Sequence, residues 1–502
     1  MKRIIYTIYF LFLIGLLPHN LYSQNCLNTS TGLPPINDLG AGYFRNFQGG
    51  LYPGGSNARP PGHNNDGVFL AKQIVPLDTA GNYNPVTGKI VLLSVGMSNC
   101  SMEFMQFMQQ VSTSPGINPK LVLVNGAQGG KSIDVILDTN NMFWTVIAQR
   151  LVAAGVSVKQ VQVVWFKEAQ AQPSDTTFPN YASGLKDKFK RAMNILNAKY
   201  KNLKQCYSAT RIYAGYATST LNPEPYSYYT GWSLKWMIED QINGDSSLNY
   251  KGTNIKSPWL SWGPYTWADG IIPNKDGLTW VCPADFNPDG THPSVAGRTK
   301  VASRLLDFFT TDETTKPWFI KSVTINLTLA VQGFLNTSTN FMNMRDTVRL
   351  YLRNNFSPFA IADSSAAVID SSTLRGVYKF YNAASGTYYI QTKHRNSIET
   401  WSRSGGESVT SGGIHEYNFT NSNSAALGNN LILAGTKYCI FSGDVNQDGS
   451  VNLSDVLMAH NDAAGFVTGY ISSDVTGNST TDLADVILIS NNAVNFVMKI
   501  TP

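Results

Sequence analysis

The sequence predicts a multidomain protein with an α/β three-layer domain built on a parallel sheet, an antiparallel β-sandwich domain and a small α-helical domain. Three observations support this prediction. Strand-like and helix-like runs alternate over residues 89–311, the apolar period changes to two over 318–438, and a motif recurs at an offset of thirty residues within 439–502. At ~150 residues per domain, a chain of 502 residues also suggests about three domains.

The composition is that of a folded protein without a marked charge preference. Hydrophobic residues make up 43% of the chain and aromatic residues 12%, which excludes a disordered chain because packed cores can form. The 38 basic and 33 acidic residues give a formal net charge of +5. This near balance gives no reason to expect nucleic acid or an anionic membrane as a partner.

The N-terminus predicts export. Lys2 and Arg3 precede a nearly apolar run over 4–17, and a polar stretch with the small residue Ser23 follows. This plan is typical of a secretory signal peptide, here over 1–23, so we expect a secreted or cell-surface protein. The run is short for a spanning helix, although an uncleaved anchor is the alternative, and no later segment reaches ~18 uninterrupted apolar residues. We therefore expect no membrane span after signal removal.

Five cysteines follow the predicted cleavage point, and none of them forms a CxxC pair. This scatter argues against a zinc site, and an odd number leaves at least one free thiol even in an oxidising compartment. We expect one or two disulfide bridges together with buried thiols.

In the first region, continuous apolar runs predict buried strands, and runs with helical spacing predict helices. Their alternation over 89–311 predicts a parallel sheet covered on both faces, with the ligand site at the carboxyl ends of the strands. Residues 24–88 are expected to form an N-terminal extension packed on this region. The expected strands are 89–95, 121–125, 160–166 and 205–214, and the expected helices are 103–111, 143–154, 181–200, 234–242 and 295–309.

A polar run that ends in Pro317 predicts a linker to the second region. Beyond it, short alternating segments separated by Gly, Ser and Asn turns predict an antiparallel β-sandwich over 318–438. This region shows no catalytic constellation, since His394 and His415 are isolated. The expected strands are 323–329, 348–352, 377–381, 388–392, 416–420 and 430–433.

Ser98 is the first candidate for chemistry. It follows an apolar strand and precedes a helix, where backbone N–H groups and the helix dipole stabilise an anion. A serine hydroxyl needs a base to become a nucleophile. Between residues 64 and 393 the only histidine is His292, and Asp289, three residues earlier, can fix the tautomer of its ring. The pattern predicts a Ser–His–Asp hydrolase, with His63 as the competing base.

These motifs resemble those of the SGNH/GDSL hydrolases, in the variant form of carbohydrate acetylesterases. Gly96-Met-Ser98-Asn resembles the first block of that family and Asp289-Gly-Thr-His292-Pro resembles the last. The resemblance covers roughly residues 89–309. It implies hydrolysis of carboxylic esters, with the serine, the histidine and the aspartate as the catalytic residues.

The same resemblance implies an oxyanion hole. Its donors are the backbone N–H groups of Ser98 and Gly130, with Gly129 as the alternative in the glycine block. After the third strand the family carries Asn or Gln as a further donor, whereas this chain carries Lys167, with Gln170 as a second candidate. Loss of one such donor costs about 2.7–4 kcal/mol in a well-studied protease, so this departure keeps an inactive relative open as an alternative.

A cluster of aromatic residues precedes the histidine loop. Such residues pack against sugar rings in a carbohydrate cleft or fill a core, and the sequence leaves both interpretations open. The residues are Trp259, Trp262, Tyr265, Trp267 and Trp280.

The last 64 residues hold an internal repeat. Oxygen-bearing side chains at alternate positions, with Gly449 at the turn, fit a twelve-residue calcium loop in the first copy. The second copy is degraded, and an acidic turn before a helix is its alternative. We expect Ca²⁺ as a structural cofactor and no cofactor for catalysis. The expected ligands are Asp444, Asn446, Asp448, Ser450 and Asp455 in the first loop and Asp474, Asn478, Thr480, Asp482 and Asp485 in the second.

Two such loop–helix units in tandem resemble a type I dockerin over 439–502. The resemblance implies a domain folded around calcium, hence the expected small α-helical calcium-loop domain, and a cohesin-like or cell-surface partner. The alternative is that the tail caps the sandwich.

We therefore expect a secreted serine esterase that acts through an acyl-enzyme, with acetyl esters on polysaccharide as the favoured substrate. The alternatives are a catalytically inactive surface protein that binds carbohydrate or protein, and a lipid esterase.

Overall fold

The computed structural model describes residues 24–175 and 177–502, so the predicted signal peptide lies outside the described residues. The chain divides into two compact units. The first holds residues 24–114 and 120–315, and the second holds 115–119 and 316–502.

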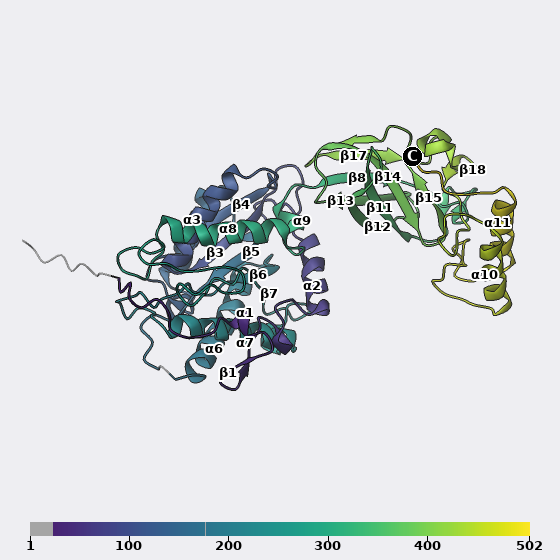
Figure 1. Ribbon diagram of the computed structural model, residues 1–502. Coiled ribbons are helices and arrows are strands. Elements are labelled where there is room, and N and C mark those ends of the chain that lie inside the picture. The colour runs from purple at the N-terminus through teal and green to yellow at the C-terminus, as the bar shows by residue number, and fades with distance from the viewer. Residues whose placement is uncertain (1–23, 176) are drawn as a thin grey trace, which may run out of the picture. The chain divides into compact units, whose positions relative to one another are not determined.

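The first unit is built on a five-stranded parallel sheet in the order β4-β3-β5-β6-β7 (Figure 1). Every residue of β3 and β5 is buried, which confirms a parallel sheet covered on both faces. The sequence did not predict β7, because its four residues carry no periodic signal. The strands are β3 (Ile90–Gly96), β4 (Leu121–Asn125), β5 (Val161–Lys167), β6 (Gln205–Ser208) and β7 (Trp259–Trp262).

Helices α3 and α8 cover one face of this sheet, and α6 and α7 cover the other (Figure 1). The five helices predicted from apolar spacing are present with shifted ends; α7, for example, begins earlier, in a run of aromatic residues. The helices of this unit are α1 (Ile36–Leu39), α2 (Pro61–Lys72), α3 (Ser98–Thr113), α4 (Ile133–Ile136), α5 (Met142–Ala153), α6 (Asn180–Lys199), α7 (Tyr226–Ile242) and α8 (Val295–Thr311).

Residues 24–88 pack on the sheet. Helix α2 lies against the edge strand β7, where a β-carbon at Gly67 would come within 2.4 Å of the Trp259 ring. The Trp262 indole N–H donates to the carbonyl of Leu51 at 2.7 Å. The segment therefore covers an edge strand that would otherwise be open to pairing. A short hairpin in it consists of β1 (Tyr43–Phe44) and β2 (Phe47–Gln48).

Two larger sheets form the body of the second unit, with β12-β11-β14-β15 and β16 in one and β13-β8-β17 in the other. One apolar core contains residues of both sheets. Strand β17 runs parallel to β8, so the predicted antiparallel arrangement is wrong for this pair. The strands are β8 (Val323–Thr328), β11 (Asp346–Asn354), β12 (Ile361–Ile369), β13 (Arg375–Phe380), β14 (Gly386–His394), β15 (Ser397–Trp401), β16 (Glu407–Val409) and β17 (Ile414–Asn418).

Short pieces complete this body. The boundary between the two units falls at residue 315, inside the run predicted as a linker, and α9 follows it directly. The short elements are α9 (Lys316–Phe319), β9 (Leu335–Asn336), β10 (Phe341–Met342), β18 (Ile432–Ala434) and β19 (Lys437–Cys439).

The tail consists of two loop–helix repeats whose helices, α10 (Leu453–Ala464) and α11 (Leu483–Val494), lie side by side (Figure 1). Both helices begin with the same capping arrangement, which the duplication explains. Ile398 of β15 is fully buried in the same small core as apolar residues of the tail, so tail and sheets share one unit.

Candidate active site

Ser98 is the first residue of α3, directly after β3. A β-carbon at Gly96 would lie 2.0 Å from the carbonyl oxygen of Lys167, so only glycine lets β3 end this close to β5. The turn places Ser98 at the carboxyl edge of the sheet and at the N-terminus of a helix of 16 residues. Its hydroxyl oxygen lies 2.7 Å from Nε2 of His292.

The histidine is held by Asp289, three residues earlier in the same loop. Nδ1 of His292 lies 2.6 Å from one carboxylate oxygen of Asp289, and the backbone N–H groups of His292 and Thr291 donate to the other at 2.9 Å each. Burial acts to raise the pKa of Asp289, but these hydrogen bonds outweigh it and hold the pKa below its usual value. The structure thus brings together the three predicted catalytic side chains.

Asn99 is a residue of the site that the sequence prediction missed. Its side chain is fully buried, and its amide N–H donates to the carbonyl of Thr291 at 3.1 Å. This bond ties the first turn of α3 to the histidine loop. The only signal in the sequence is that Asn99 directly follows the serine.

The glycine block lies close to Ser98. A β-carbon at Gly129 would be 4.0 Å from Cβ of Ser98, whereas one at Gly130 would meet no atom within 4 Å. Gly129 is therefore the glycine whose β-carbon position lies beside the serine, and the donor role of Gly130 stays a prediction. The N–H of Gln128 donates to the carbonyl of Gly96 at 2.9 Å and fixes this loop against the end of β3.

Lys167 does not serve as the predicted oxyanion donor. Its side chain is 1% exposed, and Nζ forms an ion pair with Glu103 of α3 at 2.6 Å. Burial lowers the pKa of Lys167 and raises that of Glu103, and the ion pair opposes both shifts. The charged group of Lys167 is thus held in a buried ion pair with a residue of α3. The second candidate, Gln170, accepts a hydrogen bond from Lys188 through its side-chain oxygen at 3.2 Å.

His63, the competing base, belongs to the structural core. It is buried on α2, its Nε2 lies 2.8 Å from the carbonyl of Leu260, and its ring stacks on Trp259. Burial lowers its pKa, and the histidine whose ring lies at the Ser98 hydroxyl is His292.

The aromatic cluster before the histidine loop is also core, and the carbohydrate-cleft interpretation of these residues is wrong. None of the five is more than 4% exposed, so they offer no face to a ligand: Trp259, Trp262, Tyr265, Trp267 and Trp280.

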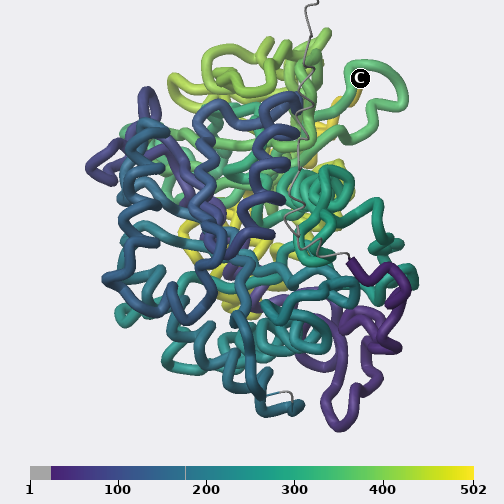
Figure 2. Tube along the Cα trace, turned by 90° about the vertical axis from the view of Figure 1, so that its left-hand side faces the viewer, coloured from purple at the N-terminus to yellow at the C-terminus, as the bar shows by residue number. Residues whose placement is uncertain are grey.

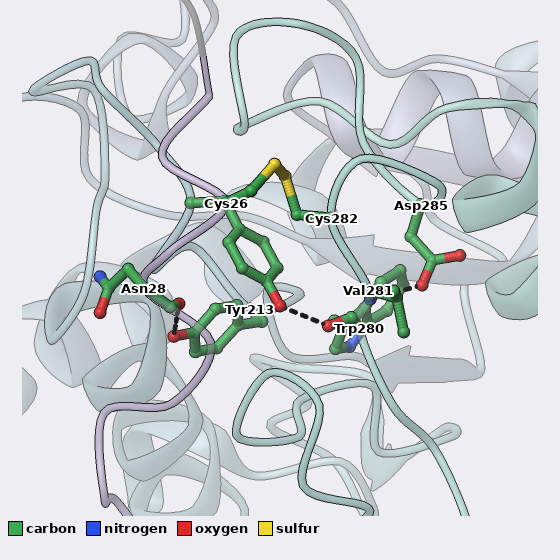
Figure 3. Close-up of a disulfide and its surroundings, with 8 residues drawn as sticks. Cys26, Asn28, Tyr213, Trp280, Val281, Cys282 and Asp285 are labelled. Atoms are coloured by element: carbon green, nitrogen blue, oxygen red, sulfur yellow. Dashed lines mark hydrogen bonds between the residues drawn. A yellow bond between two sulfur atoms is a disulfide. The ribbon is translucent and has the colours of Figure 1, made fainter.

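The histidine loop is clasped by the first described residues, which run beside it (Figures 2 and 3). Cys26 and Cys282 form a disulfide. The N–H of Gln24 donates to the carbonyl of Pro288 at 2.8 Å. The Tyr213 hydroxyl donates to the carbonyl of Asn28. The remaining three of the five cysteines are buried free thiols, which agrees with the expected mixture.

A pocket of about 270 Å³ opens beside the histidine. Its wall is almost entirely apolar, and the hydroxyl groups of Ser219 and Thr291 lie within hydrogen-bond distance of each other, at 3.3 Å. Two larger hollows, of about 780 and 540 Å³, lie along α8 and beside residues 51–65 and include none of the three predicted catalytic side chains. The pocket beside the histidine is lined by Thr218, Ser219, Leu221, Asp289, Thr291 and His292.

The first predicted calcium loop carries an unsatisfied carboxylate. Oδ1 of Asp444 is buried without a hydrogen-bond partner. Burial, reinforced by the nearby carboxylates of Asp455 and Asp448, raises the pKa of Asp444 to about 6. Within the described residues no three His, Cys, Asp or Glu side chains are grouped as a metal cluster, so a cation here would also need amide and backbone oxygens. The donor set of Asn446 and Ser450 supplies them, and the loop fits Ca²⁺.

The second loop is more fully satisfied without a cation. Asp474 accepts N–H groups from Asn478 and Ser479 at 3.1 Å each, and Arg395 of the sheet body lies 3.7 Å from the same side chain. Asp482 caps α11. This loop therefore offers less unmet charge than the first. Of the remaining predicted ligands, Thr480 donates its backbone N–H to the side chain of Asn478. The carboxylate of Asp485 accepts the backbone N–H groups of Thr476 and Asp482.

No family model matches this chain, and no curated protein matches it. Two crystal structures of type II cohesin–X-dockerin complexes from Acetivibrio cellulolyticus, a C-terminal and an N-terminal interface mutant, are 16% identical over 34% of this chain. They are covered to 94% and 93%, with TM-scores of 0.23 and 0.20. A protein from Arabidopsis thaliana is 14% identical over 41% of this chain and 67% of that chain, with a TM-score of 0.21. These values carry no argument about function, so we base the functional proposal on the geometry of the site.

Proposed function

We propose that this chain is a secreted serine esterase of the SGNH type, which hydrolyses carboxylic esters through an acyl-enzyme. One observation carries the proposal: two short hydrogen bonds link Ser98 to His292 at 2.7 Å and His292 to Asp289 at 2.6 Å. A serine at a helix N-terminus, a histidine base and a carboxylate that orients it are the parts that nucleophilic acyl transfer requires. The proposal extends to an SGNH-like first unit, a β-sandwich and a dockerin-like tail.

In the proposed mechanism, Nε2 of His292 takes the hydroxyl proton of Ser98 as the serine oxygen attacks the ester carbonyl. Backbone N–H groups at the start of α3 and at Gly129 hold the negative charge that develops on the carbonyl oxygen. The histidine then gives the proton to the leaving alcohol, and Asp289 stabilises the imidazolium while it exists. Water, activated by the same histidine, attacks the acyl-enzyme and releases the acid.

Hydrolysis of p-nitrophenyl acetate and of longer-chain esters by the mature chain tests the proposal. Turnover that is lost in Ser98→Ala and His292→Ala, but kept in the exposed control variants Ser112→Ala and His460→Ala, supports it. Equal turnover in wild type and Ser98→Ala would contradict it and favour the binding-protein alternative. A preference for acetate supports acetyl esters on polysaccharide as the substrate, and a preference for long chains supports lipid.

We also propose that the tail binds Ca²⁺ through its first loop. Asp444, Asn446, Asp448, the Ser450 carbonyl and Asp455 would hold the ion, which supplies positive charge to a cluster of carboxylates. The unpartnered oxygen of Asp444 supports this role. Calcium has no part in the proposed chemistry at Ser98.

The tail is further proposed to bind a cohesin-like protein on a scaffold or cell surface. The two helices expose matching apolar side chains, with Leu457 and Ile487 52% and 51% exposed. Exposed apolar residues in a matching pattern support a protein partner. Titration of cohesin domains with wild type and with Leu457→Asp/Ile487→Asp tests this, and unchanged affinity in the double variant would contradict it.

None of the helices in residues 24–175 and 177–502 combines the length and hydropathy that membrane crossing requires.

A further inference from the structure

The second calcium-like loop packs directly on the sheet body of its unit. A β-carbon at Gly333 would lie 2.0 Å from the carbonyl oxygen of Val475, so only glycine lets the two backbones approach this closely. The side-chain amide of Asn343 donates to the carbonyl of Thr476 at 2.8 Å. The sheet body therefore contacts the loop through its backbone as well as through side chains.

Arg395 joins this loop to the sheet body. It lies in the turn between β14 and β15, and its side chain is 13% exposed. Its Nε donates to Asp346 at 2.8 Å, and its Nη1 donates to the carbonyl of Ile471. Its Nη2 lies 3.7 Å from Oδ2 of Asp474, the first predicted ligand of the second loop. One guanidinium thus contacts the sheet body and the second repeat at the same time.

Asp346 fixes the position of this guanidinium. It is the first residue of β11, and its side chain is 3% exposed. Its carboxylate lies 3.1 Å from Nε2 of His394 and accepts the hydroxyl of Tyr470, which belongs to the tail. The guanidinium carbon of Arg395 also lies over the Tyr470 ring, 4.5 Å from its centroid. The arginine is therefore held by the sheet body and by the tail before any metal binds.

The first loop has a different electrostatic environment. Asp444 occupies the position that Asp474 has in the second loop, and its Oδ1 is buried without a hydrogen-bond partner. The largest charge effects on the pKa of Asp444 come from the negative side chains of Asp455 and Asp448. The first position is thus surrounded by like charge in one loop and faces an arginine in the other.

A fixed positive charge changes what calcium can add to a loop. The affinity of such a loop for Ca²⁺ depends on the charge of its ligands. A guanidinium at 3.7 Å compensates part of the charge of Asp474 and repels a further cation. The contacts of Arg395 and Tyr470 across the junction need no metal. The second repeat consequently obtains both positive charge and attachment from the protein itself.

We infer that Arg395 is a resident cation for the second loop, which holds the second repeat (residues 470–494) on the sheet body without calcium, so that calcium orders only the first repeat (residues 444–464). The tail then has one permanently attached half and one calcium-dependent half, which contains α10. The statement about the first repeat rests on the calcium site proposed there, whereas the role of Arg395 does not.

Hydrogen exchange of the mature chain, read by mass spectrometry, tests both halves in one experiment. In wild type, a chelator is expected to raise exchange over 444–464 by at least about tenfold and exchange over 470–494 by less than about twofold. This comparison needs no substitution. Equal opening of the two repeats in the chelator would overturn the inference.

Arg395→Gln tests the role of the arginine itself. In the chelator, exchange over 470–494 is expected to rise by at least about tenfold, and calcium should reverse much of the rise because the carboxylates of the loop are then free to bind it. Arg349→Gln, at an exposed arginine of β11, is the matched control and should behave as wild type. Unchanged protection of 470–494 in Arg395→Gln would overturn the role of Arg395.

Arg395→Lys guards against damage to the sheet body. It keeps the positive charge, so it should protect 470–494 in the chelator better than Arg395→Gln does, while exchange over β11 and β14 shows whether the sheets are intact. Equal loss in the two variants would show that the charge has no part and would overturn the inference.

Calorimetric titration with Ca²⁺ separates this inference from the proposed calcium site. We expect one ion per wild-type chain and two per chain of Arg395→Gln. Two equivalent ions in wild type would overturn the inference. If wild type binds none, the proposed site of the first loop fails, and the exchange of Arg395→Gln in the chelator still decides the role of the arginine.

Discussion

The ring Nδ1 of His292 lies 2.6 Å from a carboxylate oxygen of Asp289, and both residues belong to one loop before α8. The other oxygen of Asp289 receives two backbone N–H groups of that loop. The carboxylate is thus oriented from both sides, which leaves Nε2 of the histidine as the atom available to Ser98.

This relationship predicts a severe effect of Asp289→Asn on turnover. The amide favours the wrong tautomer of the histidine, and the equivalent change in a serine protease costs about 10⁴-fold in kcat. We expect a loss of similar order in a variant that still unfolds cooperatively, although at a somewhat lower urea concentration because the carboxylate is gone; p-nitrophenyl acetate hydrolysis and urea unfolding measure the two effects. Activity within a few-fold of wild type would exclude the assigned role.

The lowered pKa of Asp289 fixes the sign of one pH effect. Because the folded-state pKa lies below the usual 3.8, the stabilisation from this carboxylate is present above that value and is lost only as the pH falls through the lower folded value. If activity already falls while the pH is lowered towards about 5, that loss must come from the titration of another group. The same loss should then be seen in the pH profile of Asp289→Glu.

The disulfide that ties the N-terminal segment to the histidine loop is expected to contribute to the free energy of unfolding of the first unit. Cys26 and Cys282 are separated by 256 positions, and removal of a native disulfide typically costs about 2–5 kcal/mol. Cys26→Ser/Cys282→Ser is expected to lower the free energy of unfolding of the first unit by this amount. Reductant should lower the stability of wild type by the same amount and have no further effect on the variant. Equal stability of oxidised wild type, reduced wild type and the variant would contradict the stabilising role of this disulfide.

The ion pair of Lys167 and Glu103 predicts a structural role for this lysine. Lys167→Met leaves a buried carboxylate unpaired, which typically costs about 3–5 kcal/mol of unfolding free energy. Lys167→Met/Glu103→Gln should recover most of the loss, because no charge is then left alone. If Lys167 were an oxyanion donor, the double variant would fold and still lose kcat by about 10²–10³; we expect its kcat to stay near that of wild type.

The two calcium loops predict different responses to the same change. Asp448 and Asn478 occupy the fifth position of the first and second loop, and both are exposed. Calcium at about 100 times its Kd should stabilise the wild-type tail by about 2.7 kcal/mol, and a chelator should remove this. Asp448→Ala is expected to abolish most of the effect and Asn478→Ala to leave most of it, measured by calorimetry. Equal responses would contradict the difference between the loops.

Local patterns in the sequence predicted which three side chains the structure brings together at the candidate active site. Asp289 and His292 lie three residues apart, and Ser98 is marked by a buried strand before it and a helix after it, so their placement follows from short stretches of chain. The parallel sheet was predictable for the same reason. Strand β12 was not, because its run of small and polar residues between Ile361 and Ile369 shows no apolar alternation and gains its place by pairing with β11.

The errors concern residues whose partners are distant in the sequence. Lys167 follows a strand as a donor of the site would, but its environment is decided by Glu103 on another element. The five aromatic residues before the histidine loop are of the types that line sugar clefts, but the structure buries all of them in the core. The choice between Gly129 and Gly130 depends on the turn of one loop, which a glycine pair cannot specify.

The most direct test of the central claim is covalent labelling of the nucleophile. The mature protein is treated with a fluorophosphonate, which reacts with activated serine hydroxyls, and the modified peptide is identified by mass spectrometry. We predict stoichiometric label on Ser98, none in Ser98→Ala and strongly slowed labelling in His292→Ala. A folded protein that takes up no label, or carries it on another residue, would contradict the claim that Ser98 is an activated nucleophile.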